Sequence, residues 1–156
     1  MKYIISTLLT LALAVGIASP VQAKRGSDGQ LNLLYWQAPS TMNPNLSGGT
    51  KELEASSVVL EPLGRYDENG NLLAWLAEEI PTVANGGISK DLTTITWKIK
   101  KGIKWSDGSA LTADDAVFTY EYCSHPDTGC TQSNYWSDIK SVTAVNSLTV
   151  KVEFNV

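Results

Sequence analysis

The sequence predicts an α/β fold in which strands and hairpins alternate with a few helices. Residues 93–100 alternate apolar and polar side chains, as in a strand with one buried face, and a helix follows from Thr112. The Asn69-Gly70 pair lies between short extended segments, which is a strong hairpin signal. Residues 148–154 also alternate and predict the second strand of a final hairpin.

The start of the chain has the three regions of a secretory signal peptide. Lys2 supplies a positive charge, residues 4–17 form an apolar core, and residues 21–23 are typical of a cleavage site. An apolar core of about 14 residues is shorter than the roughly 20 that a membrane-spanning helix needs. We therefore expect residues 1–23 to be removed by cleavage after Ala23. No cysteine lies near that point, so we expect a periplasmic protein without a lipid anchor.

A strand and a loop are expected next. Residues 31–37 are apolar on both faces, which predicts a strand buried on both sides. After two prolines, the loop from Ser47 to Thr50 contains Gly48 and Gly49. Two glycines allow a backbone to approach a ligand closely, and an ordinary turn is the alternative. The loop lacks the spacing of a phosphate-binding loop.

A helix is predicted over residues 52–60. Leu53, Val59 and Leu60 are expected among its buried positions, and Pro62 ends it. A tight turn is predicted further along, at residues 106–109, where aspartate and glycine follow one another.

The second helix carries its own start signal. Thr112 occupies an N-cap position, and Asp115, three residues later, completes a capping box. Asp114 and Asp115 also place negative charge in the first turn, where the helix dipole favours it. These roles in folding account for both carboxylates.

Cys123 and Cys130 enclose six residues, which in an exported chain predicts a small disulfide loop. Metal binding is the alternative because His125 lies between them. As this is the only histidine, the three residues make a poor zinc site, and we expect neither a metal nor another cofactor.

Tyr135 and Trp136 are adjacent aromatic residues outside any periodic segment. They either pack on a ligand or close the core over the cysteine loop, and the sequence favours neither.

Charge and motifs exclude several function classes. The formal net charge of −4 provides no basic surface for nucleic acid or anionic lipid. A secreted hydrolase would need two carboxylates that flank one bond, drawn from Asp107, Asp114 and Asp115. Asp114 and Asp115 are adjacent and point about 100° apart on a helix, so they cannot both face that bond. We therefore expect no enzyme.

A resemblance to a known family rests on these segments. Residues 100–121 read KKGIKWSDGSALTADDAVFTYE, and this run resembles the signature of the family 5 extracellular solute-binding proteins, the receptors of bacterial ABC importers. The sequence Met42-Asn43-Pro44 is similar to a second element of that family.

The resemblance implies a two-lobed fold like that of periplasmic binding proteins, with a mixed sheet, hairpins and a few helices. Residues 24–51 would form the first strand and loop of the large lobe, and residues 52–156 a small α/β domain of the N-terminal lobe. We expect the chain to be truncated, with the second lobe missing.

The implied function is a receptor that delivers peptides to the permease subunits of an ABC importer in the inner membrane. The ligand-facing segments would be Ser47–Thr50 and Tyr135–Trp136, and we expect a monomer that binds no nucleic acid. Relatives also take up nickel, oligosaccharides or opines, so these ligands are the alternatives.

Overall fold

The structure is a computed structural model that describes residues 29–30 and 32–155. The chain divides into two units, residues 1–36 and residues 37–156. The expected signal peptide lies outside the described residues. Among the described residues, no helix is both long and apolar enough to cross a membrane.

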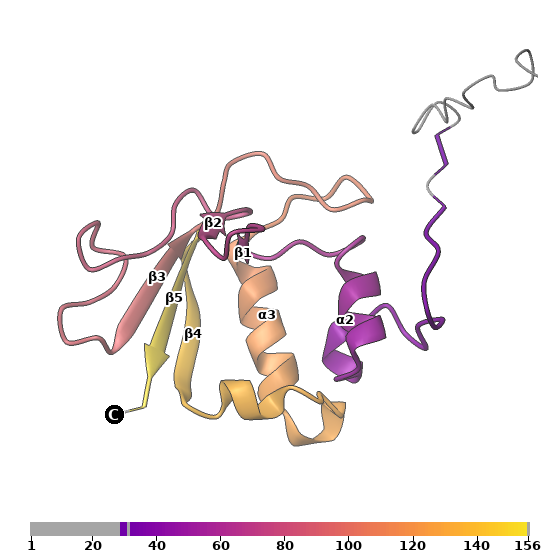
Figure 1. The fold of residues 1–156 in the computed structure, drawn as a ribbon. Coiled ribbons are helices and arrows are strands. Elements are labelled where there is room, and N and C mark those ends of the chain that lie inside the picture. Colours follow the sequence, from indigo (N-terminus) through magenta and orange to yellow (C-terminus); the bar gives the residue numbers. More distant parts are fainter. Residues whose placement is uncertain (1–28, 31, 156) are drawn as a thin grey trace, which may run out of the picture. The chain divides into compact units, whose positions relative to one another are not determined.

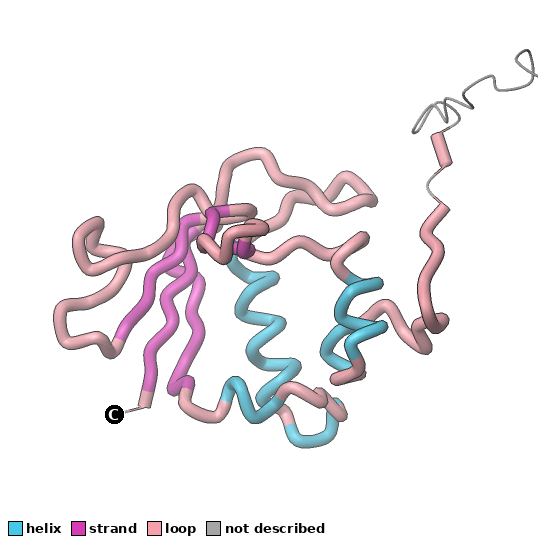
Figure 2. Tube along the Cα trace, viewed as in Figure 1, coloured by secondary structure: helices cyan, strands magenta, loops and turns pink. Residues whose placement is uncertain are grey.

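A three-stranded antiparallel sheet and one long helix form the centre of the second unit. The strands are β3 (Thr94–Lys98), β4 (Ile139–Asn146) and β5 (Thr149–Phe154), in the order β3-β5-β4. Helix α3 (Ala113–Ser124) lies against one face of this sheet (Figure 1). Strands and helices therefore form two layers in this part of the chain (Figure 2).

The alternation of residues along the strands sorts apolar and polar side chains onto opposite faces. Trp97 pairs with Val150 across β3 and β5, and both side chains belong to the apolar face under α3. On the polar face, Glu153 accepts from Lys151 Nζ at 2.9 Å and from Ser141 Oγ at 3.0 Å. The buried core comprises Ile99, Ala113, Val142 and Val150.

Helix α3 begins where the capping box predicts. Thr112 is the N-cap, and its backbone N–H donates to Oδ2 of Asp115 at 2.7 Å. The N–H of Ala113 donates to the carbonyl of Ser147, in the turn between β4 and β5, at 2.9 Å. A local cap and a long-range bond thus fix the same end of the helix.

The predicted Asn-Gly hairpin is confirmed. Strands β1 (Gly64–Tyr66) and β2 (Leu72–Ala74) pair antiparallel, and Gly70 in their turn has φ +81°. The chain then reaches the main sheet, where the N–H of Lys100 donates to the carbonyl of Leu76 at 2.9 Å.

The first α-helix differs from its prediction. Helix α2 spans Thr50–Ser56, so it starts earlier and ends sooner than the helix expected over residues 52–60. Thr50, expected as the last residue of the loop from Ser47, is therefore the first residue of this helix. The expectation that Leu53, Val59 and Leu60 are buried is wrong, since they are 42%, 61% and 38% exposed.

The buried face of α2 is polar instead. Glu52 is 1% exposed, and its Oε1 accepts from the N–H of Ser40 at 2.9 Å and from the Ser40 hydroxyl at 2.6 Å. Lys51 Nζ lies 3.1 Å from the same oxygen. Helix α2 thus turns this carboxylate inward to meet its donors, and Leu53, its one large apolar side chain, is exposed.

The strand predicted over residues 31–37 is not formed. Residues 32–37 have no strand conformation, and Leu33, Leu34 and Trp36 are exposed. A strand buried on both faces needs neighbouring segments on both sides.

Replacing Asp115 by alanine should lower the free energy of unfolding by about 1 kcal/mol more than replacing Asp114, because only Asp115 accepts from the N-cap N–H. Asp114 is exposed in the same helical turn, so its replacement controls for the loss of charge near the helix dipole. Urea unfolding of the two variants measures the difference. Equal losses would show that the cap bond contributes nothing.

Glu52 should make stability depend on pH. Hydrogen bonds from the hydroxyl and the backbone N–H of Ser40 lower the pKa of Glu52 from 4.5 to about 2. The charged carboxylate therefore stabilises the fold fully above pH 4.5, and this contribution is lost as the pH falls toward about 2.

Glu52→Gln should accordingly unfold at lower urea concentration than wild type near neutral pH, and the gap should shrink as the pH falls from 4.5 to about 2. Glu54→Gln, exposed on the same helix, serves as the control for removing one charge. A gap between wild type and Glu52→Gln that is independent of pH would contradict the assignment.

Candidate functional site

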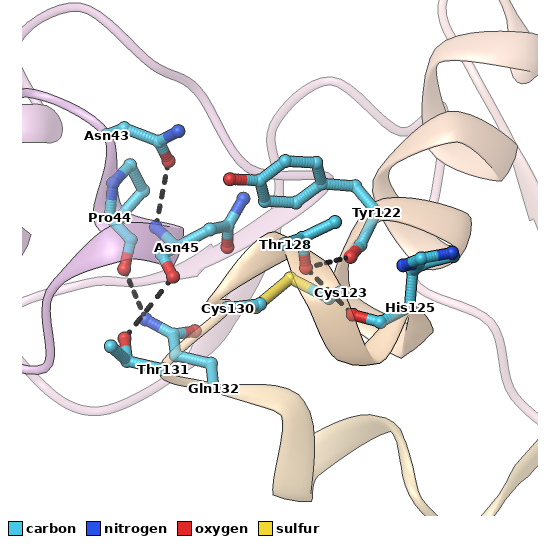
Figure 3. The surroundings of a disulfide bond; sticks show 10 residues. All are labelled: Asn43, Pro44, Asn45, Tyr122, Cys123, His125, Thr128, Cys130, Thr131 and Gln132. Carbon is cyan, nitrogen blue, oxygen red and sulfur yellow. Dashed lines mark hydrogen bonds between the residues drawn. A yellow bond between two sulfur atoms is a disulfide. The ribbon is translucent and has the colours of Figure 1, made fainter.

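The cysteine loop follows α3 directly. Cys123 and Cys130 form a disulfide, which confirms the predicted pairing and leaves no thiolate of this pair for a metal. Both cysteines are buried. Inside the loop, the hydroxyl of Thr128 donates to the carbonyls of Tyr122 at 2.7 Å and His125 at 2.9 Å (Figure 3). The loop is therefore closed by a covalent bond and by hydrogen bonds to the end of α3.

Residues just after this loop contact the short 3-10 helix η1 (Pro44–Leu46), as Figure 3 shows. The N–H of Thr131 donates to the carbonyl of Asn45 at 2.8 Å, and Nε2 of Gln132 donates to the carbonyl of Pro44 at 2.9 Å. We call these contacts the seam. The seam joins segments more than 80 residues apart in the sequence.

Each predicted ligand segment begins a few residues from the seam. Ser47 follows η1 directly, so Ser47–Thr50 begins two residues from Asn45. On the donor side of the seam, the 3-10 helix η3 (Ser133–Trp136) follows Gln132 directly and ends with Tyr135 and Trp136. Two and four residues of chain span at most about 7 and 14 Å. Ser47, Tyr135 and Trp136 therefore lie within these distances of the seam.

The two glycines of the Ser47–Thr50 loop have different surroundings. A Cβ added to Gly48 would meet nothing within 4 Å, whereas one added to Gly49 would lie 2.5 Å from Oε2 of Glu52. Gly49 thus gives room to the buried carboxylate, and Gly48 leaves the backbone open. Neither glycine has a positive φ, so backbone conformation does not require glycine at either position. At Gly49 the close approach of the Glu52 carboxylate leaves no room for a side chain.

Glu52 was missed as a residue of this site. Its Oε1 binds Ser40, and its Oε2 is buried against Gly49 without a hydrogen-bond partner among the described residues. The one sequence signal was a glutamate in the first turn of a helix whose N-cap, Gly49, has no side chain to pair with it.

The aromatic pair divides into two roles. Trp136 is partly buried, and its ring lies 6.0 Å from the ring of Tyr120 on α3. The hydroxyl of Tyr120 donates in turn to the carbonyl of Ile139 at 3.3 Å. Tyr135 is 75% exposed. Trp136 therefore packs against α3, while Tyr135 presents its ring to solvent. That the pair packs on a ligand stays a prediction.

Two aspartates of the signature run, Asp107 and Asp115, accept hydrogen bonds in a turn and in a helix cap. Oδ1 of Asp107 accepts from the hydroxyl of Ser109 at 2.7 Å and from its N–H at 2.8 Å. These bonds lower the pKa of Asp107, and the bond from the Ser109 hydroxyl has the larger effect. Asp115 holds the N-cap N–H, as described above. Among the described residues, no group of three histidine, cysteine, aspartate or glutamate side chains is placed to hold a metal.

Comparison with known proteins identifies the family of this chain. Residues 71–156, more than half of the chain, match the model of the bacterial extracellular solute-binding proteins, family 5 Middle. A probable ABC transporter-binding protein of Deinococcus radiodurans is 32% identical over 99% of this chain, which covers 27% of that protein.

Solved structures of family members share the fold. The oligopeptide-binding protein AppA from Bacillus subtilis, in complex with a nonapeptide, is 30% identical with a TM-score of 0.66. NikZ from Campylobacter jejuni, in complex with Ni(L-His), is 28% identical with a TM-score of 0.64. Each match covers 76% of this chain and 22% of the solved one.

The chain thus spans about a quarter of the length of the relatives it matches. The fold expected from the resemblance is confirmed, although both sheets among the described residues are antiparallel. The chain belongs to the bacterial extracellular solute-binding proteins of family 5.

Proposed function

We propose that this chain is part of a receptor that binds short peptides outside the cytoplasm and delivers them to an ABC importer. The likeness to AppA, whose solved structure holds a nonapeptide, is the observation that carries the proposal. In this proposal the ligand lies in a cleft that the chain shares with a second lobe, and the protein binds its ligand without catalysing a reaction.

The ligand contacts are proposed at Ser47–Thr50 and at Tyr135, with Trp136 in support. The backbone at Gly48 is open, which suits the main-chain hydrogen bonds by which an extended peptide adds to a protein segment. The exposed ring of Tyr135 offers an apolar face and a hydroxyl to a side chain of the bound peptide. Trp136 holds its neighbour in place by packing on Tyr120.

The route to the site of action belongs to the same proposal. The protein is exported, loses residues 1–23 by cleavage after Ala23, and acts in the periplasm as a monomer without a lipid anchor. Its partners are the permease subunits of the importer in the inner membrane.

A metal chelate is the second candidate ligand. NikZ, solved with Ni(L-His), has nearly the same TM-score against this chain as AppA. The receptor proposal is the same for both ligands, and only the content of the cleft differs.

Calorimetric titration of the complete gene product with a pool of di- to pentapeptides should show micromolar binding, while the 156-residue chain alone should bind weakly or not at all. Tyr135→Ala should weaken peptide affinity about tenfold, as loss of a buried aromatic contact does. Tyr66→Ala is the matched control, since Tyr66 is a similarly exposed tyrosine on β1.

Titration with Ni(L-His) and mass spectrometry of the peptides complete the test. Binding of Ni(L-His) but of no peptide would replace the first ligand by the second. Cleaved peptides would show an enzyme and overturn the receptor proposal.

A further inference from the structure

The seam consists of donors on one side and consecutive backbone carbonyls on the other. Thr131 offers both its N–H and its hydroxyl to the carbonyl of Asn45, at 2.8 and 3.3 Å. The side-chain amide of Gln132 reaches the carbonyl of Pro44. All three bonds end on η1, which leads directly into the Ser47–Thr50 loop.

The donor side is tied to the sheet. Thr131 follows Cys130, and the disulfide joins Cys130 to Cys123 in the last turn of α3. Helix α3 packs on the main sheet. The donors therefore have a position fixed by a covalent bond to an element of the core.

The acceptor side is a small closed turn. Oδ1 of Asn43 accepts from the N–H of Asn45 at 2.9 Å, and the N–H of Leu46 donates to the carbonyl of Asn43 at 3.2 Å. A displacement of Asn45 therefore carries the whole turn, and Ser47 with it.

The loop is held again at its far end. Glu52 binds Ser40 through Oε1, and Lys51 Nζ donates to the carbonyl of Ala38 at 3.1 Å. Between these two attachments, Gly48 has open space around it. The segment is thus fixed at both ends, with Gly48 exposed between them.

We propose that Thr131 and Gln132 are positioning residues for the ligand loop Ser47–Thr50, and that the Cys123–Cys130 disulfide anchors them to α3. The proposal rests on the proposed function in one respect, that this loop contacts the ligand. Without the seam the loop keeps its chemistry but loses its fixed position. Binding then has to order it, which lowers affinity.

Gln132→Met is the most direct variant, because it keeps the length of the side chain and removes the amide that donates to Pro44. Asn134→Leu is the matched control, since it removes an amide from an exposed position between the seam and Tyr135. A double variant, Cys123→Ser with Cys130→Ser, removes the anchor.

Two measurements are made on each variant of the complete gene product. Hydrogen exchange should speed up at the amides of residue 43 and residues 45–50 in Gln132→Met and in the double cysteine variant. It should stay unchanged in α3 and β5 for Gln132→Met. Affinity for the same peptide pool should fall about three- to tenfold in both variants, and not in Asn134→Leu.

The outcomes separate this proposal from the proposed function. If wild type binds no peptide, the proposed function fails, and the exchange of residues 43–50 still decides whether the seam positions the loop. Unchanged exchange there in Gln132→Met overturns the positioning role. Faster exchange with unaltered peptide affinity shows that the loop is not part of the ligand site. If the double cysteine variant unfolds, Gln132→Met, with its disulfide intact, decides alone.

Discussion

The backbone N–H of Ala113 donates to the carbonyl of Ser147 at 2.9 Å, and this bond joins the first residue of α3 to the turn between β4 and β5. Ala113 is fully buried, so the donor of this bond is shielded from water. The cap formed by Thr112 and Asp115 fixes where the helix begins, and the bond fixes where that beginning lies on the sheet. The rest of the structure depends on this attachment, because every later contact of α3 takes its position from it.

From that point α3 extends to the disulfide, and the disulfide loop leads to the seam. A helix of 12 residues spans roughly 18 Å, so α3 carries the position of the sheet to a site well away from its own cap. The signature run of the family thus affects the position of segments far from its own cap. Its residues form the turn, the cap and the helix. The disulfide loop at the end of that helix, together with the seam, positions the segments proposed to contact the ligand. Two carboxylates in the run, those of Asp107 and Asp115, accept local hydrogen bonds.

The sequence predicts the parts of this structure that depend on neighbours along the chain. The capping box, the Asn-Gly hairpin and the disulfide loop are local patterns, and each is confirmed. Contacts between irregular segments have no periodic pattern, so the seam at Asn45 and Thr131 and the bond from Ser40 to Glu52 were not predictable. The prediction of buried side chains was wrong for the same reason. Leu33, Leu34 and Leu53 are apolar, but whether such side chains are buried depends on contacts with segments elsewhere in the chain. Within the candidate site, the contacts at Ser47–Thr50 and Tyr135–Trp136 stay predictions, and the difference in exposure between Tyr135 and Trp136 required the structure.

A crystal structure of the complete gene product with a bound peptide tests the central claim most directly, namely that one ligand site is assembled around the seam. The account predicts that the main chain of Ser47–Thr50 and the ring of Tyr135 contact the same peptide, with the Thr131 to Asn45 hydrogen bond intact beside them. A peptide that contacts neither segment would contradict the account.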